Sequence, residues 1–343
     1  MAQVRFGIVG CGMISNFHAK AIETIENAVL IGACSKSSAS AERLCREFNV
    51  RKFDTYEEML ACPEIDAVAI CTPSGDHARQ ILQALDAGKH VVVEKPMCIR
   101  LEDCDAVIRK ADETGRKVCV ISQLRFSDAI QEMKRAIDAG EMGKLYSTAL
   151  TMRYFRSQAY YDSAAWRGTW ALDGGGVLMN QGIHGVDMLC YLFGPAQSLS
   201  GYAQTMGRDI EVEDTAVTAI RFENGMLGTI DASTCCEPGF PKKIVVSGEK
   251  GTIVMEEDAI TLWTLPTPCQ IPIGAATGNS ASSDPRGILL TNHARQFRNF
   301  VDAVLNGAPL VSDAREGRLP LEIILGTYQS SREGKPIQIR HFE

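Results

Sequence analysis

Residues 4–22 read VRFGIVGCGMISNFHAKAI, and this stretch decides the fold of the first part of the chain. It begins as a short apolar strand and continues, through the turn GCGMIS (10–15), as an amphipathic helix. The turn matches two of the three glycines of the pattern G-x-G-x-x-G and would offer backbone N–H groups to a pyrophosphate. A plain tight turn is the alternative. We expect a dinucleotide to contact the residues of this turn: Gly10, Gly12, Met13 and Ile14.

The rest of the first 124 residues alternates strand and helix. Amphipathic helices separate four further apolar strands: VLIGACS (29–35), IDAVAICTP (65–73), KHVVVEKP (89–96) and KVCVISQL (117–124). Nearly continuous apolar strands joined by helices predict a parallel sheet covered on both faces. We therefore expect residues 1–124 to form an α/β, doubly wound Rossmann domain that binds NAD(P).

In a Rossmann domain, residues at the end of the second strand contact the 2′ position of the cofactor's ribose. Chains that bind NAD usually place Asp or Glu there, but the sequence CSKSS (34–38) has no acid before Glu42. A hydroxyl and an ammonium suit a 2′-phosphate better than a bare ribose. Ser35 and Lys36 therefore favour NADP over NAD, unless Lys36 is simply a solvated surface lysine.

After residue 125 the alternation stops. A long strand (145–155) precedes an aromatic loop, and a run of strands joined by hairpin turns occupies residues 198–265. A Pro-, Gly- and Ser-rich stretch (266–290) predicts a long loop, and two helices follow it. We expect residues 125–343 to form an α+β domain with an open, mostly antiparallel mixed sheet, whose C-terminal helices can pack back on the first domain.

Within that second part, DGGGVLMNQGIHGVDML (173–189) places three glycines before an apparent single helix. Consecutive glycines allow a close approach of another backbone or a ligand. Helical spacing puts four polar side chains in one stripe: Asn180, His184, Asp187 and Tyr191. A histidine exchanges protons near neutrality, so His184 is a candidate base, although helix histidines are commonly packing residues. For Asp187, one turn on, the alternative is a helix-facing structural carboxylate.

Composition limits the class of protein. A chain of 343 residues favours two domains, and 45% hydrophobic with 22% charged residues is ordinary for a globular protein. No apolar run approaches the roughly 20 residues that span a bilayer, and the N-terminus enters a glycine turn instead of a cleavage site, so we expect a cytoplasmic protein. The net charge of −7, without blocks of like charge, argues against nucleic-acid binding.

Cysteine and histidine patterns do not indicate a metal site. The twelve cysteines contain no C-x-x-C pair, and the six histidines show no ligand spacing such as H-E-x-x-H. We expect buried reduced thiols at the cysteines within apolar runs: Cys11, Cys34, Cys71, Cys119 and Cys190. A metal or redox role stays open for the adjacent pair Cys235 and Cys236.

The segment RYFRSQAYYDSAAWRGTW (153–170) suggests the substrate. Aromatic faces stack on the C–H patches of sugars, and arginine forks bind hydroxyls, carboxylates or phosphates. We expect a polyhydroxylated substrate that contacts Arg153, Tyr161, Trp166 and Arg167, in addition to Asn180 and His184. Convergence of at least two arginines would favour an acidic or phosphorylated sugar. The alternative is aromatic packing over the sheet with solvated arginines.

Three separated segments resemble one family: GIVGCGMIS (7–15), VVVEKPM (91–97) and GGGVLMNQGIHGVD (174–187). They are similar to the glucose–fructose oxidoreductase, inositol dehydrogenase and MocA-like proteins, and CTPSGDH (71–77) and residues 317–339 look like later markers of that family. The resemblance implies an NAD(P)-dependent dehydrogenase that transfers a hydride between the nicotinamide and a secondary carbinol of a sugar, a sugar derivative or a cyclitol. It also implies a homo-oligomer, a dimer or tetramer, formed through the C-terminal sheet.

The resemblance also implies roles for individual residues. Lys95, in E-K-P, would stabilise the developing oxyanion, and the Lys95–Pro96 bond would be cis. His184 would act as the base from the second domain. The other implied cofactor contacts are Thr72, Pro73, His77 and Glu94.

Position 180 departs from one branch of the family. Inositol dehydrogenase-like members carry Asp four residues before this histidine, where this chain has Asn180. An amide can bind a hydroxyl or orient His184, but it cannot share a proton or supply negative charge. The substitution points away from a plain inositol dehydrogenase.

Two other functions stay open on sequence. One is a glycosidase that oxidises its sugar transiently, eliminates the glycosidic substituent and re-reduces the ring. The other is a cofactor-binding regulator without chemistry, which an intact Lys95 and His184 disfavour.

Overall fold

The computed structural model describes residues 2–274 and 290–342. Of the loop predicted at 266–290, the part up to residue 274 contains no helix or strand, and residues 275–289 lie outside the described residues. The chain divides into two compact units, Met1–Gln123 with Leu289–Arg318 and Leu124–Ile288 with Leu319–Glu343. The helices within residues 2–274 and 290–342 are too short or too polar to span a bilayer.

The first unit contains a six-stranded sheet in the order β3-β2-β1-β4-β5-β6, and all of its strand pairs are parallel. Its strands are β1 (Val4–Val9), β2 (Ala28–Cys34), β3 (Arg51–Lys52), β4 (Ala67–Ile70), β5 (His90–Val93) and β6 (Val118–Val120). Strands β2 and β3 extend the sheet on one side of β1, and β4, β5 and β6 extend it on the other, which is the strand order of a Rossmann domain. The predicted parallel sheet is confirmed. The two-residue β3 was not predicted, because its charged sequence has no apolar pattern.

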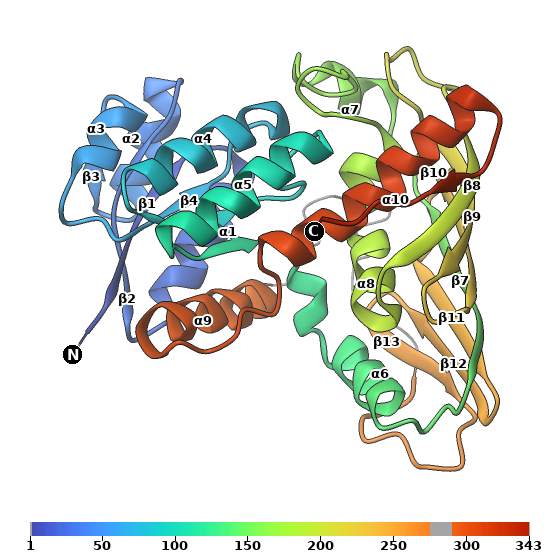
Figure 1. The fold of residues 1–343 in the computed structure, drawn as a ribbon. Coiled ribbons are helices and arrows are strands. Elements are labelled where there is room, and N and C mark those ends of the chain that lie inside the picture. Colours follow the sequence, from blue (N-terminus) through green and yellow to red (C-terminus); the bar gives the residue numbers. More distant parts are fainter. Residues whose placement is uncertain (1, 275–289, 343) are drawn as a thin grey trace. The chain divides into compact units, whose positions relative to one another are not determined.

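Helices accompany this sheet (Figure 1). They are α1 (Met13–Glu23), α2 (Ser38–Glu47), α3 (Tyr56–Ala61), α4 (Ser74–Asp86), α5 (Leu101–Thr114) and α9 (Leu290–Asn306). Helix α9 comes from far along the chain and packs against α1 and β1. The rings of Phe297 and Phe300 each lie 5.8 Å from the ring of Phe6, centre to centre. A distant segment thus completes the core of the first unit.

The second unit contains an eight-stranded sheet in the order β13-β12-β11-β7-β10-β9-β8-β14. Its strands are β7 (Leu145–Arg153), β8 (Ala196–Gln204), β9 (Thr215–Phe222), β10 (Leu227–Ser233), β11 (Lys243–Gly248), β12 (Gly251–Glu256), β13 (Ala259–Trp263) and β14 (Ile337–Gln338). Strands β7 and β10 pair in parallel and the other pairs are antiparallel. The predicted mostly antiparallel mixed sheet is confirmed.

The two faces of this sheet differ. Helices α6 (Asp128–Asp138), α8 (Ile183–Phe193) and α10 (Ala314–Glu333) lie on one face (Figure 1). Helix α8 lies so close that a Cβ on Gly185 would meet the side chains of Leu150 and Met152. On the other face, alternate residues of the strands expose large apolar side chains: Tyr202, Val217, Leu227 and Leu262.

The single helix predicted after the glycines is wrong at its first turn. Val177–Gln181 form a π-helical turn, η2, in which the N–H of Gly182 donates to the carbonyl oxygen of Val177 at 2.6 Å, and α8 begins after it. A Cβ at position 182 would lie 2.7 Å from that oxygen, so the glycine permits the wide turn. Such single turns disturb the regular helical spacing, which no periodicity of apolar residues reveals.

Candidate active site

The glycine turn of the first unit fits a dinucleotide. Gly10 has φ +88°, and a Cβ there would lie 2.7 Å from the carbonyl atoms of Cys71. A Cβ on Gly12 would meet no described atom within 4 Å, so the backbone faces open space at this position. Gly12 is the N-cap residue of α1 and supplies no side-chain cap, which leaves the first N–H groups of the helix, from Met13 and Ile14 onward, suited to a pyrophosphate.

At the end of β2, Lys36 forms an ion pair with Asp76. The Lys36 side chain is 85% exposed, and its Nζ lies 3.1 Å from Oδ2 of Asp76 in the first turn of α4. Ser35 Oγ accepts the N–H of Ser37 at 3.4 Å. The ammonium that favoured a 2′-phosphate is thus paired with a carboxylate.

His77 ties two loops of the first unit together. Its ring nitrogens lie 2.8 Å from the carbonyl oxygens of Thr72 and Pro96, and its burial lowers the imidazole pKa. Pro73, the N-cap residue of α4, follows Thr72 directly. The Lys95–Pro96 bond is cis, as the resemblance implied. His77 therefore fixes the loop that carries Lys95 against the loop that follows β4.

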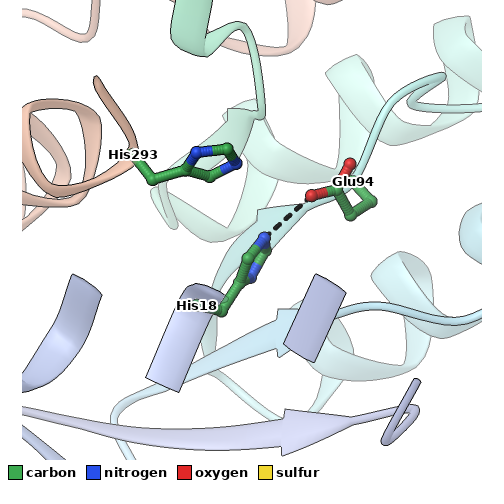
Figure 2. A group of neighbouring side chains, drawn as sticks. All are labelled: His18, Glu94 and His293. Carbon is green, nitrogen blue, oxygen red and sulfur yellow. Dashed lines mark hydrogen bonds and ion pairs between the residues drawn. The ribbon is translucent and has the colours of Figure 1, made fainter. Parts of the chain in front are cut away.

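Glu94 lies in a buried cluster with His18 of α1 and His293 of α9 (Figure 2). His18 Nε2 is 2.8 Å from Glu94 Oε1, and Glu94 Oε2 accepts the N–H of Lys95 at 3.2 Å. Burial disfavours the charged form of Glu94, but the hydrogen bond and charge of His18, with the charges of His293 and Lys95, outweigh it and lower the carboxyl pKa to about 2. This carboxylate therefore holds the backbone of Lys95.

The same three side chains are the one group in residues 2–274 and 290–342 that could hold a metal ion, with ligand atoms within 4.8 Å of one another. Two imidazoles and a carboxylate would suit Zn²⁺. The closest pair is already joined by the hydrogen bond between His18 and Glu94, which explains their proximity without an ion.

In the second unit, η2 and α8 carry Asn180 and His184. Both side chains are half-buried, whereas most of this segment is buried. The Asn180 amide donates through Nδ2 to Oδ1 of Asp173 at 2.8 Å. Asp187 is different: it is buried, and the Arg125 guanidinium donates to it at 2.7 to 3.2 Å. The structural alternative for Asp187 is therefore confirmed.

The three glycines at 174–176 pack closely against Glu213 and Tyr328. A Cβ on Gly176 would overlap the carbonyl oxygen of Glu213, and one on Gly175 would overlap the hydroxyl of Tyr328. The Glu213 carboxyl accepts the N–H groups of Gly176 and Leu178 and the Tyr328 hydroxyl, at 2.8 to 2.9 Å. Burial raises the Glu213 pKa to about 7. Glu213 thus anchors the start of the segment that presents Asn180 and His184.

Two arginines of the aromatic segment share one ring. The guanidinium carbons of Arg167 and Arg156 lie 4.3 and 5.6 Å from the centre of the Tyr160 ring, and Arg167 Nη1 donates to the Tyr160 hydroxyl at 2.6 Å. Gln181 Nε2 lies 3.3 Å from the same hydroxyl. Arg167 Nε and Gln181 Oε1 are buried and have no hydrogen-bond partner among the described residues. This Tyr160 cluster (Tyr160, Arg156, Arg167 and Gln181) therefore contains a donor and an acceptor suited to a ligand.

Of the other predicted substrate residues, Trp166 and Tyr161 lie beside the Tyr160 cluster, and Arg153 does not. Trp166 packs on Arg167, with its ring centre 4.5 Å from the guanidinium carbon. Tyr161 is buried, and its hydroxyl bonds Thr234 at 3.0 Å, which is a packing role. Arg153 pairs with Asp231 in the outward-facing row of the sheet, opposite to the face on which α8 packs.

Sequence reasoning missed several residues that surround these sites: Asp173, Glu213, Tyr328, Gln181, His18 and His293. Of these, Asp173 had a local signal, because it directly precedes the three glycines. Glu213 and Tyr328 reach the glycines from distant segments, which no local pattern reveals. The five cysteines expected to be buried are buried, and Cys235 and Cys236 are half-buried.

Comparison with known proteins places the chain in a family. Residues 4–122 match the model of an oxidoreductase family with an NAD-binding Rossmann fold, and residues 130–254 match the GFO/IDH/MocA C-terminal domain. The chain is 31% identical to scyllo-inositol 2-dehydrogenase (NAD(+)) of Bacillus subtilis (strain 168), across 98% of this chain and 96% of that protein.

A solved structure is similarly close. The WlbA dehydrogenase from Bordetella pertussis, in complex with NADH and UDP-GlcNAcA, is 33% identical and superimposes with a TM-score of 0.89, covering 99% of this chain and 98% of that chain. The chain therefore belongs to the GFO/IDH/MocA family and is an oxidoreductase with an NAD-binding Rossmann domain.

Proposed function

We propose that this protein is a dehydrogenase that oxidises a secondary carbinol of a sugar derivative. A nicotinamide cofactor with its pyrophosphate at the glycine turn would supply the hydride acceptor. His184 removes the hydroxyl proton and Lys95 stabilises the developing charge on the oxygen. The observation that carries this proposal is the pair Asn180 and His184, which are half-exposed polar residues on an otherwise largely buried segment.

For the substrate, we propose a nucleotide-linked sugar acid. Two cations packed on Tyr160, with buried donor and acceptor atoms beside them, suit a carboxylate or phosphate together with a hydroxyl. The WlbA dehydrogenase was solved with UDP-GlcNAcA, which is a ligand of this class. A cyclitol is the second candidate, supported by the relative named scyllo-inositol 2-dehydrogenase, but it lacks the anionic groups that would occupy the Tyr160 cluster.

For the cofactor, we propose NAD in place of the NADP that Ser35 and Lys36 favour on sequence. The pairing of Lys36 with Asp76 reduces its value for a 2′-phosphate, which would also approach the Asp76 carboxylate. Two relatives support this choice: one is named for NAD(+) and the other was solved with NADH.

The exposed face of the sheet supports a homo-oligomer. Tyr202 and Val217 are direct cross-strand neighbours and are 65% and 47% exposed. Exposed apolar side chains on one flat face are typical of an interaction surface. A second copy of the chain is the partner that we propose for it.

One assay tests the proposed reaction. The purified protein is incubated with NAD or NADP and either UDP-N-acetylglucosaminuronic acid, its neutral UDP-N-acetylglucosamine counterpart or an inositol, and the reduced cofactor is followed by absorbance. We expect reduction of NAD with the acidic nucleotide sugar and little with the neutral one. Equal rates with both nucleotide sugars would contradict the acidic substrate, and release of UDP without reduced cofactor would indicate elimination chemistry.

A further inference from the structure

The carboxylate of Asp173 is held on both sides. Asp173 is only 3% exposed and lies directly before the three glycines. One of its oxygens accepts the N–H of Gly168 at 2.9 Å, and the other accepts Nδ2 of Asn180 at 2.8 Å. Because both oxygens are engaged, the carboxylate has a fixed position beside the first turn of the segment that carries His184.

This contact determines the orientation of the Asn180 amide. An ionised carboxylate only accepts hydrogen bonds, so the NH₂ end of the amide must face Asp173. The Asn180 oxygen then points away from Asp173 as an acceptor. Position 180 therefore presents an oxygen acceptor, as an aspartate would, although the residue itself is neutral.

The negative charge that an aspartate at position 180 would supply is still present: it lies on Asp173, one hydrogen bond away from position 180. A buried carboxylate acts strongly on nearby groups because little water screens it. His184 follows Asn180 by four residues, from the π turn η2 into the first turn of α8. Resting on the proposed function, we infer that Asp173 is a positioning residue that works through Asn180: it orients the amide and stabilises the imidazolium formed when His184 takes the proton.

The other charged groups of this region have partners of their own. Asp187, on α8, is paired with Arg125. Glu213 accepts two backbone N–H groups and the Tyr328 hydroxyl. The Tyr160 hydroxyl accepts from Arg167. Asp173, in contrast, is a carboxylate of the second unit that is hydrogen-bonded to Asn180.

The first test removes the charge and keeps the shape. Asp173→Asn is expected to lower kcat roughly 10- to 100-fold, with little change in KM, because the base is less well oriented and its protonated form less stabilised. The acidic limb of the pH profile of kcat/KM should move to lower pH. Glu211→Gln is the matched control, since the Glu211 carboxylate accepts the N–H of Trp170 in the same loop, and it should leave both quantities unchanged.

The second test moves the charge back to position 180. The double variant Asp173→Asn, Asn180→Asp has the wild-type net charge and is expected to recover most of the lost kcat and the wild-type pH limb. A role of Asp173 confined to folding predicts no such rescue. Loss of activity in the single variant without recovery in the double variant would overturn the inference.

A readout without substrate separates this inference from the proposed function. The titration of the His184 imidazole is followed by NMR in histidine-labelled protein and assigned with His184→Gln; its midpoint should fall in Asp173→Asn and return in the double variant. If Asp173→Asn does not fold, the single variant Asn180→Asp provides the test. Its His184 titration midpoint should stay near that of the wild type, because two touching carboxylates share one proton. A rise of this midpoint would refute the role of Asp173. Absence of turnover with every sugar would refute the proposed function alone.

Discussion

At the scale of single residues, the two glycines of the first turn have different tasks. Gly10 is required by the backbone of Cys71 and by its positive φ, whereas Gly12 faces open space. We expect Gly10→Ala to lower the free energy of unfolding by roughly 1–3 kcal/mol. Gly12→Ala should leave stability unchanged and weaken NAD binding. Denaturant titration and calorimetric NAD binding check the pair, and an equal loss of stability in both variants would contradict this division.

The arginines also differ residue by residue. Arg167→Gln removes a cation from the Tyr160 cluster, so KM for the acidic nucleotide sugar should rise roughly 10-fold or more, in line with the worth of a hydrogen bond to a charged group. Arg153→Gln removes a cation from the opposite face of the sheet and is the control, with KM unchanged. Steady-state kinetics with both variants check this, and similar KM values for Arg167→Gln and the wild type would exclude Arg167 from the substrate site.

At the scale of elements, the start of η2 depends on Glu213. Its folded-state pKa of about 7 lies above its ordinary value of 4.5, so burial of the protonated carboxyl stabilises the fold at low pH. That contribution is complete below about pH 4.5 and is lost as the pH rises through about 7; it amounts to roughly 3 kcal/mol at 1.36 kcal/mol per pKa unit.

Glu213→Gln removes this titration. The free energy of unfolding of the wild type, relative to Glu213→Gln, should therefore decrease between pH 4.5 and 7.5, as measured by urea denaturation. Glu211→Gln, which changes a carboxylate on the exposed part of the same segment, should follow the wild type. Parallel curves for the wild type and Glu213→Gln would show that Glu213 does not titrate in this range.

Local patterns in the sequence predicted much of the elements and less of their contacts. Most strands of both sheets follow from apolar runs and alternation, apart from the two-residue strands β3 and β14, and the glycine turn follows from its motif. The π turn η2 does not, because one wide turn leaves the composition of the helix unchanged. The partners of the glycines and of Asn180 are also invisible locally: Glu213 lies 37 residues from Gly176, as the numbering shows, and its contact exists only after folding.

At the scale of the whole molecule, α9 shows again that local patterns do not reveal long-range contacts, since its packing on α1 joins segments separated by most of the chain.

The exposed face of the second unit's sheet leads to a prediction about assembly. Substitution of Val217 by Lys, in the middle of β9, should split the assembly or lower its mass, because a charge would replace an apolar contact at the interface.

Light scattering of the purified protein measures this mass. Glu64→Lys, which changes an exposed charge in the first unit, is the control and should leave the mass unchanged. A monomeric wild-type protein, or an assembly that Val217→Lys leaves intact, would rule out this face as the interface.

The central claim is that Lys95 and His184 perform the proton chemistry of a hydride transfer. The direct test is the rate of NADH formation from the acidic nucleotide sugar by the wild type, Lys95→Met and His184→Gln, alongside calorimetric binding of NAD to each. We predict that both variants bind NAD like the wild type and form NADH at least roughly 100-fold more slowly. Variants that bind NAD and retain the wild-type rate would contradict the account.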